Sequence, residues 1–273
     1  MNTAQPKQEH TTRAEQALPA VQEAAAAFPR GLMQPEGSYR FGLDALLLAA
    51  FATASISSLP RYHTATGRAF AAADLGTGCG VVAAGLALQL PALHCLAFEK
   101  EAPLAHAAEL NMARLGLGAR VRVHKADLAQ PASLALAKKS SLDAVLMNPP
   151  YRLATAGRLS PSLLRQGALA GEAATLEIFA RAAAALLKHH APCYAIFAAS
   201  GLPRLIAAFS TAGLGLRRIL PVYAREGQAA KMLLIQAAKG AQHDLHFESP
   251  LLLYSAAQST AYSAQAQAFC PWL

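Results

Sequence analysis

The stretch AADLGTGCGVVA, residues 72–83, decides the fold. It continues an apolar run, Phe70–Leu75, which we predict to be a buried strand, and it leads into Val81–Gln89, which has the composition of a helix. The glycines between the two allow the backbone to turn sharply and to approach a ligand closely. A loop of this kind after the first strand of an α/β fold is the usual binding place for an adenosine-containing cofactor.

Apolar strands and helices alternate on both sides of this loop. The predicted strands are Phe70–Leu75, His94–Glu99, Arg120–His124, Leu142–Met147, Cys193–Ala198 and Met232–Ala237. The predicted helices are Leu43–Ala54, Val81–Gln89, Ala102–Leu115, Ser133–Lys138, Thr175–Lys188 and Leu202–Ala212. Such alternation predicts βαβ units, and therefore a Rossmann-like α/β fold with a mostly parallel sheet covered by helices on both faces.

Three carboxylates end three successive predicted strands: Asp74, Glu99 and Asp127. A carboxylate at Asp74 would repel a pyrophosphate, but it suits the ammonium group of S-adenosylmethionine, directly or through water. Glu99 can accept hydrogen bonds from ribose hydroxyls, and Asp127 can accept one from an adenine amino group, with Leu128 against the ring. Each acid alone is more often a solvated strand end, but together with the glycine loop they favour S-adenosylmethionine.

The fourth strand runs into Asn148, Pro149, Pro150 and Tyr151, the tetrapeptide NPPY. The prolines fix the backbone and remove two donors. The Asn148 amide oxygen and the Pro149 carbonyl can therefore both accept hydrogen bonds from a planar amino group. This would stabilise the developing tetrahedral nitrogen. Tyr151 offers a flat face for an unstacked base. We expect these four residues to be catalytic, because a merely rigid turn is the less probable reading at this place.

These motifs resemble those of class I amino-methyltransferases. More narrowly, the signature QPEGSYRFGLDALLL (residues 34–48) and residues 225–231 resemble the bacterial tRNA1(Val) (adenine(37)-N6)-methyltransferase family, whose members methylate an adenine beside the anticodon. The resemblance runs from about residue 34 to 240. It implies a seven-stranded sheet with an antiparallel C-terminal strand, and it places Tyr39, Phe41 and Asp44 at the cofactor pocket, Asp44 near the methionine end. The predicted cofactor-binding set is Tyr39, Phe41, Asp44, Asp74, Gly76, Thr77, Gly78, Gly80, Glu99, Lys100, Asp127, Leu128 and Asn148.

RNA is the expected substrate, with a tRNA anticodon loop as the expected target. The net charge of +8 favours a polyanionic partner, and loop bases are already partly unstacked. Arg152, Arg158 and Arg165, in a loop predicted over Arg152–Gly171, are expected to contact phosphates, as is Arg225, and Arg217 and Arg218 could add to this basic rim. A solvated charged loop is an equal alternative. One departure from the family is that Glu172 follows a glycine instead of a histidine.

Other functions use the same motifs. A protein glutamine N5-methyltransferase also acts on a planar amide, although its members add a larger N-terminal domain, and a guanine-N2 methyltransferase uses a similar tetrapeptide. A non-enzymatic S-adenosylmethionine-binding scaffold would have no reason to keep the tetrapeptide. A nicotinamide-dependent oxidoreductase would have no use for it. We therefore expect an RNA adenine-N6 methyltransferase.

Composition sets the remaining expectations. Cys79, Cys95, Cys193 and Cys270 lack zinc-ligand spacing, so buried reduced thiols and no metal are expected. No signal peptide or membrane span is apparent, which suggests a cytoplasmic protein, monomeric or homodimeric. The predicted organisation is a flexible arm at 1–30, a methyltransferase domain at 31–240 whose first part, 31–60, caps the cofactor, and a C-terminal extension at 241–273.

Overall fold

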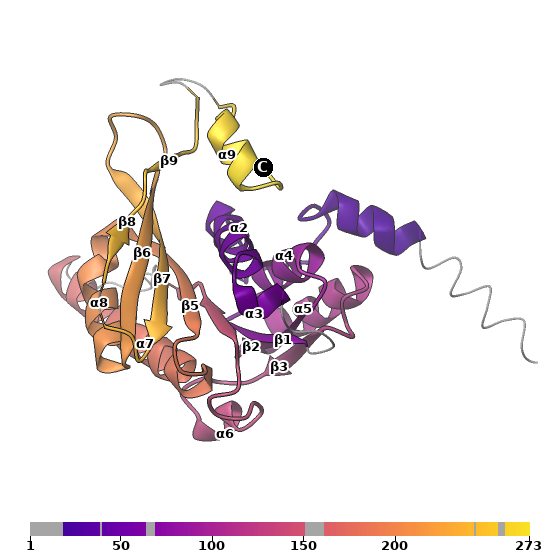
Figure 1. Ribbon diagram of the computed structural model, residues 1–273, viewed down its shortest axis with the longest axis horizontal. Helices are drawn as coiled ribbons and strands as arrows, with labels where there is room; N and C mark the ends of the chain where they lie inside the picture. Colours follow the sequence, from indigo (N-terminus) through magenta and orange to yellow (C-terminus); the bar gives the residue numbers. More distant parts are fainter. Residues whose placement is uncertain (1–18, 39, 64–68, 151–160, 243, 256–259) are drawn as a thin grey trace, which may run out of the picture.

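The computed structural model describes residues 19–38, 40–63, 69–150, 161–242, 244–255 and 260–273, with the backbone alone over 161–170. In this part of the chain nine strands form one sheet (Figure 1). They are β1 (Phe70–Leu75), β2 (Leu93–Glu99), β3 (Val121–Lys125), β4 (Ala144–Met147), β5 (Pro192–Ala198), β6 (Leu214–Tyr223), β7 (Ala230–Lys239), β8 (His246–Phe247) and β9 (Leu251–Leu252).

The strand order is β3-β2-β1-β4-β5-β7-β6-β8, and β9 also pairs with β6. Strands β1 to β5 are parallel to their neighbours, whereas β7 runs antiparallel between β5 and β6. The first seven strands therefore have the predicted arrangement, with one antiparallel strand near the C-terminus. The prediction of a Rossmann-like α/β fold is confirmed. Two short strands, β8 and β9, extend its edge.

Helices cover both faces of the sheet. They are α2 (Leu43–Ser57), α3 (Pro60–His63), α4 (Val81–Gln89), α5 (Ala102–Arg114), α6 (Pro131–Leu134), α7 (Pro161–Leu186), the 3₁₀ turn η1 (Ala199–Gly201), α8 (Leu202–Thr211) and α9 (Ala264–Phe269). In Figure 1, α2 and α4 lie above the sheet, and α6 and α7 lie below it. Neighbouring residues Ala72 and Ala73 of β1 pack in opposite cores, so this strand is buried on both sides.

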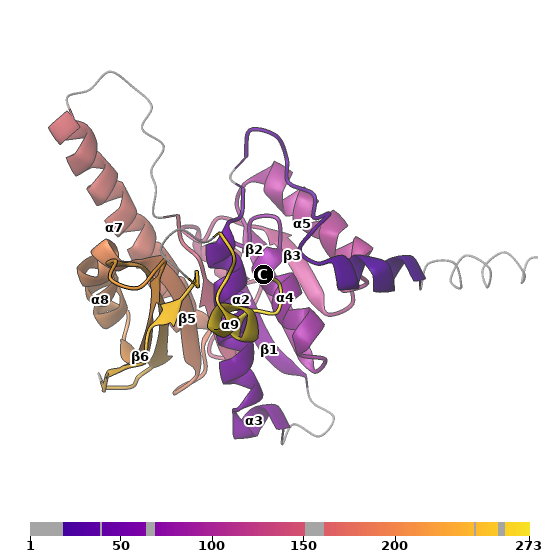
Figure 2. The same ribbon diagram turned by 90° about the horizontal axis from the view of Figure 1, so that it is seen from above.

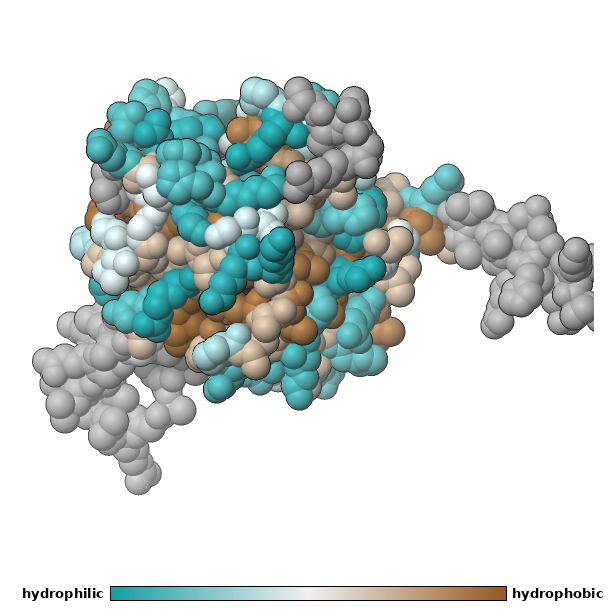
Figure 3. All heavy atoms as spheres, turned by 60° about the horizontal axis from the view of Figure 1, so that its bottom comes forward, coloured by the Kyte–Doolittle hydropathy of each residue, from teal (hydrophilic) through white to brown (hydrophobic). Residues whose placement is uncertain are grey.

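The helix α6 is shorter than the predicted Ser133–Lys138 helix and begins two residues earlier. Leu136, just after it, is 50% exposed. Figure 3 looks toward this underside, and apolar residues surface there between hydrophilic ones. No helix in the described residues is both long and apolar enough to span a bilayer.

The helix α7 begins at Pro161, so the predicted loop up to Gly171 is wrong over its second half. The helix includes Gly167 and Gly171, although glycine disfavours helices by about 1 kcal/mol relative to alanine. Proline is tolerated in the first helical turn, however. The buried C-terminal part of α7, with Leu176, Ala183 and Leu186 in the lower core, provides the packing that offsets the glycines.

The strand β6 was not among the predicted strands, and it contains Pro221, a residue that is disfavoured inside a strand. The structure explains how the proline fits. Pro221 pairs with Leu233 of β7, and on its other side it lies between the short strands β8 and β9. The ladder is interrupted there, and proline is tolerated where a strand lacks a continuous partner.

Segments near both ends of the chain pack on the upper core. Residues 19–27 are helical, and Phe28 after them is buried. The Trp272 ring meets the Phe28 ring edge-on, with centroids 5.3 Å apart. The helix α9 lies against α2 in Figures 1 and 2. The folded structure therefore includes part of the predicted arm and of the predicted C-terminal extension.

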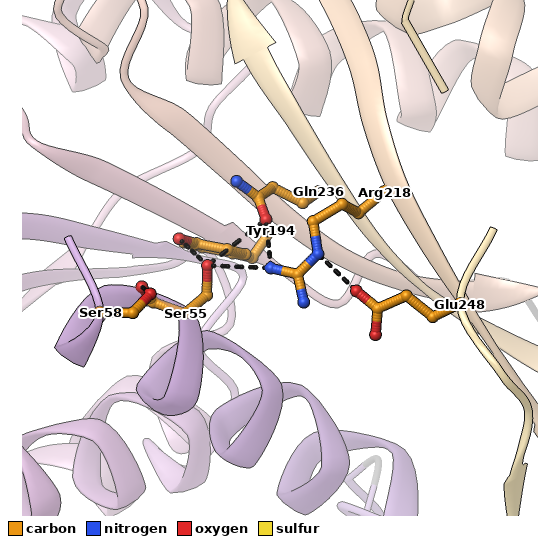
Figure 4. A network of polar contacts seen from close by, with 6 residues as sticks. All are labelled: Ser55, Ser58, Tyr194, Arg218, Gln236 and Glu248. Carbon is orange, nitrogen blue, oxygen red and sulfur yellow. Dashed lines mark hydrogen bonds and ion pairs between the residues drawn. The ribbon is translucent and has the colours of Figure 1, made fainter. Parts of the chain in front are cut away.

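A polar network joins α2 to the β5–β7–β6 part of the sheet (Figure 4). The Tyr194 hydroxyl donates to Ser55 Oγ at 2.9 Å. The Arg218 guanidinium donates to Gln236 Oε1 at 2.9 Å and pairs with Glu248 Oε1 at 2.5 Å, and it lies 5.3 Å from the centre of the Phe51 ring. Arg217 pairs with Asp244 at 3.2 Å. The prediction that Arg217 and Arg218 belong to a basic rim is therefore wrong for Arg218, which is committed to this network.

Tyr194→Phe is expected to lower the free energy of unfolding by about 1 kcal/mol, the usual net value of a buried hydrogen bond. Burial raises the pKa of Tyr194 to about 12, so the hydroxyl stays a donor at neutral pH. Urea unfolding measures the effect. Tyr62→Phe is the control, because the Tyr62 hydroxyl accepts only a long, exposed hydrogen bond of 3.4 Å from Ala92 N. Equal stability of the two variants would contradict the prediction.

Candidate active site

A cavity of about 360 Å³ lies at the carboxyl ends of the parallel strands, where α/β folds bind ligands. Its walls come from α2, the glycine loop, the ends of β2, β3 and β4, and α7. The lining residues are Phe41, Ala45, Gly76, Thr77, Gly78, Cys79, Val81, Val82, Phe98, Glu99, Lys100, Glu101, Leu104, Ala126, Asp127, Leu128, Asn148, Pro149, Pro150, Thr175, Ile178 and Phe179.

The glycine loop requires its glycines for two reasons. Gly76, Gly78 and Gly80 have φ angles of 69°, 60° and 88°, which side chains rarely adopt. A Cβ atom at Gly76 would also lie 2.9 Å from Phe179 Cζ, and one at Gly80 would lie 2.8 Å from Met112 Cε. The loop backbone is thus held close to α7 and α5. Gly80 caps α4 and does not line the cavity.

Asp74 lies beneath this loop and is 1% exposed. Its Oδ2 atom accepts hydrogen bonds from Thr77 Oγ1 at 2.6 Å and from Ala83 N at 3.2 Å. Asp74 is not among the residues that line the cavity. The carboxylate therefore fastens the loop to the first turn of α4. Its predicted contact with the methionine ammonium stays a prediction.

Burial raises the pKa of Asp74 from 3.8 to about 6, with the hydrogen bond from Thr77 acting in the opposite direction. Because the folded protein then binds the proton more tightly than the unfolded chain, its stability falls as the pH rises from about 4 to about 6, by an amount on the order of 2–3 kcal/mol. Urea unfolding of the ligand-free protein between pH 4 and pH 7 measures this slope. Asp74→Asn should lose it, and an unchanged slope in that variant would contradict the assignment.

Glu99 is a buried carboxylate at the cavity wall, 6% exposed. Its Oε2 atom accepts from Gly78 N, and its Oε1 atom accepts from Glu101 N, each at 2.9 Å. These bonds fix the carboxylate and leave further acceptor positions. Asp127 and Leu128 also line the cavity, and Asp127 Oδ1 accepts from Ala129 N at 3.0 Å. The structure thus brings both predicted acids to one cavity.

A buried amide connects the segment before α2 with the glycine loop. Asn111 of α5 is 1% exposed. Its Nδ2 atom donates to Met33 O at 3.0 Å and to Cys79 O at 2.9 Å, and its Oδ1 atom accepts from Met33 N at 2.7 Å. This residue was missed in the sequence. The available signal was that Asn111, a polar amide, lies on the apolar side of a predicted helix.

Asn148 ends β4 and lines the cavity together with Pro149 and Pro150. Its Nδ2 atom donates to Asp44 Oδ2 at 3.2 Å. Its Oδ1 atom is buried and accepts no hydrogen bond from any described residue. Such an acceptor is costly to bury unless a ligand donates to it.

Some of the remaining predicted site residues line the cavity, and others do not or lie outside the described residues. Phe41 and Lys100 line the cavity, whereas Asp44 does not. Tyr39, Tyr151, Arg152 and Arg158 lie outside the described residues, and Arg165 is described only as backbone of α7. The guanidinium of Arg225 lies 4.7 Å from the centre of the Tyr254 ring.

Several lining residues had no predicted role. Ile178 and Phe179 of α7 line the cavity. Phe179 lies in the predicted helix Thr175–Lys188, and it also packs in the lower core, where it is 9% exposed.

The four cysteines are free and buried, as expected. Burial raises the pKa of the Cys79 thiol to about 11 and that of Cys193 to about 12. Cys79 lines the cavity, but it stays a protonated thiol at neutral pH and is a poor nucleophile. It acts as a small wall residue. No group of three metal-binding side chains occurs among the described residues.

Comparisons with known proteins show which families and folds this chain resembles. Residues 56–186 match the family model of the methyltransferase small domain. No curated protein matches the chain. A predicted O-methyltransferase from Agrobacterium tumefaciens superimposes with a TM-score of 0.63 at 24% identity, over 84% of this chain and 96% of that one. The human methyltransferase 10 domain containing protein superimposes with a TM-score of 0.56 at 13% identity, over 87% of this chain and 100% of that one. A proposed RNA methyltransferase from Pyrococcus horikoshii superimposes with a TM-score of 0.52 at 18% identity, over 81% of this chain and 98% of that one.

The fold is that of a class I methyltransferase. The methyl donor is accordingly S-adenosyl-L-methionine. The residues present fit it. Glu99 offers a fixed, buried carboxylate for ribose hydroxyls, Asp127 lies at the next strand end, and Phe98, Leu104 and Leu128 supply apolar walls for a ring. The narrower resemblance to the tRNA adenine-N6 family stays a prediction.

Glu99→Ala is expected to weaken binding of S-adenosylmethionine about tenfold to hundredfold, because it removes hydrogen bonds to a charged acceptor, each contributing about 1.5–3 kcal/mol. Isothermal titration calorimetry measures the dissociation constant. Glu109→Ala is the control, because the Glu109 side chain is 59% exposed and does not line the cavity. A Glu99 variant with wild-type affinity would show that this carboxylate does not hold the cofactor.

Proposed function

We propose that this protein methylates the N6 amino group of an adenine in RNA, with a tRNA anticodon-loop adenine as the preferred target. The observation that carries the proposal is the buried Asn148 Oδ1 atom, which accepts no hydrogen bond from the described residues and belongs to a cavity wall. An acceptor so placed matches a substrate that brings an N–H donor.

The chemistry follows from the poor nucleophilicity of an exocyclic amine, whose lone pair is delocalised into the ring. S-adenosylmethionine supplies an electrophilic methyl group when it is bound. Asn148 Oδ1 and the Pro149 carbonyl oxygen accept hydrogen bonds from the two N–H groups of the amine and favour a tetrahedral nitrogen. They therefore stabilise the transition state more than the ground state. No strong base is needed, because the methylated cation is acidic and loses its proton to water. Tyr151 as the stacking residue remains a prediction.

The charge distribution supports RNA as the substrate. The net charge is +8. Strand β7 runs antiparallel to β5, and Met232 pairs with Ala198 at the end of β5. The connection between β6 and β7, which contains Arg225 and is followed by the exposed Lys231, therefore lies at the same end of the sheet as the cavity. Basic side chains at this rim suit a phosphate backbone.

The test is transfer of radiolabelled methyl from S-adenosylmethionine to total tRNA of a strain that lacks the gene, followed by nucleoside analysis. We expect label in N6-methyladenosine. Asn148→Ala should lower the rate by about a hundredfold or more, in the range seen when one transition-state hydrogen bond is removed.

Two controls accompany this assay. Asn148→Ala should bind S-adenosylmethionine within about threefold of the wild-type protein, because the variant keeps the carboxylates Glu99 and Asp127. Label in guanine N2, or in a protein glutamine when cell extract replaces tRNA, would overturn the adenine assignment. Each of those substrates also presents a planar amino group.

A further inference from the structure

The first turn of α2 meets the catalytic asparagine across 104 positions of sequence. Asp44, 5% exposed, places Oδ2 3.2 Å from Asn148 Nδ2. It is the acidic residue of the first turn of α2, where a negative charge is favoured by the helix dipole. Asn148 lines the cavity and Asp44 does not. The carboxylate therefore stands behind the amide, on the side away from the cavity.

This contact determines which way the amide faces. An amide has a donor side and an acceptor side, whereas an ionised carboxylate only accepts. Asp44 can thus bind only the NH₂ group of Asn148, which turns Oδ1 to the other side. That oxygen is the buried atom without a partner among the described residues. The reversed amide would present N–H groups to an incoming amine and repel it.

Gly42 makes room for this carboxylate. A Cβ atom at Gly42 would lie 2.8 Å from Asp44 Oδ1, well inside contact distance. The backbone does not need glycine there, since Gly42 has φ −114° and ψ −171°, an extended conformation open to any residue. The absence of a side chain is therefore explained by the position of the Asp44 carboxylate.

We propose that Gly42 and Asp44 orient the Asn148 amide so that its oxygen faces the substrate amine. Asp44 is then a positioning residue and not a ligand of the cofactor, in contrast to the role that the family resemblance implies. The inference rests on the proposed function, in which Asn148 accepts hydrogen bonds from an amino group.

The experiment compares Asp44→Asn, Gly42→Ala and Gly118→Ala. Asp44→Asn keeps the volume, but its own NH₂ group can bind Asn148 Oδ1 and reverse the amide. Gly42→Ala keeps the carboxylate and displaces it. Gly118→Ala is the matched control, because a Cβ atom there meets nothing within 4 Å. Each variant is measured for S-adenosylmethionine affinity by calorimetry, for kcat and KM on tRNA, and for the Asn148 side-chain NH₂ resonances by NMR.

We expect kcat to fall about tenfold to hundredfold in Asp44→Asn and less in Gly42→Ala, with S-adenosylmethionine affinity within about twofold and Gly118→Ala unchanged. The Asn148 NH₂ resonances should shift and exchange faster with water in Asp44→Asn. Weakened cofactor binding with unchanged kcat would make Asp44 a cofactor ligand and overturn the proposal, as would wild-type kinetics in both variants.

The NMR readout separates this proposal from the proposed function, because it needs no substrate. If the wild-type protein fails to methylate RNA adenine, the proposed function fails. The NH₂ resonances of Asn148 still decide the orientation: a shift in Asp44→Asn supports it, and an unchanged spectrum rejects it. If Asp44→Asn does not fold, the same NMR measurement on Gly42→Ala decides the orientation.

Discussion

The site depends on the hydrogen bonds that the buried carboxylate of Asp74 accepts. It accepts from Thr77 within the glycine loop and from Ala83 in the first turn of α4, so one side chain ties strand, loop and helix together. The loop can approach a ligand closely because its glycines lack side chains, but the same freedom would make it entropically costly to order. Asp74 offsets that cost by anchoring the loop from below. Glu99 then holds it from the side through Gly78 N.

The carboxylates of the site divide into two kinds. Glu99 and Asp127 line the cavity and present acceptors to a ligand. Asp44 and Asp74 lie outside the lining and hold other groups, an amide in one case and a loop in the other. Sequence spacing cannot separate these kinds, because Asp74, Glu99 and Asp127 all stand at the ends of predicted strands although Asp74 supports the loop and the other two line the cavity.

The sequence predicted what depends on local pattern. The β1–loop–α4 unit was predicted to the residue, since the apolar run, the glycines and the following helix agree with one another. It also predicted that Asn148, Pro149 and Pro150 lie at the ligand crevice, and all three line the cavity; the role of Asn148 as an amine acceptor stays a prediction. It missed what depends on distant contacts. Strand β6 is shaped by its neighbours β7, β8 and β9, and α7 is stabilised by packing that overrides its glycines. The contact between Asp44 and Asn148 joins residues 104 positions apart.

The close contact between α2 and α4 has a consequence for the chemistry. A Cβ atom at Gly85 would lie 3.0 Å from Ala49 Cβ and 3.0 Å from Trp272 Cη2, so small residues set the separation of the two helices. Because a helix moves nearly as a rigid body, the height of α2 above the sheet also sets where Asp44 stands relative to Asn148. The geometry of the hydrogen bond between Asp44 and Asn148 therefore depends on the spacing of an interface about one and a half turns further along the helix. A change of a single methyl group in that interface would displace Asp44 relative to the Asn148 amide.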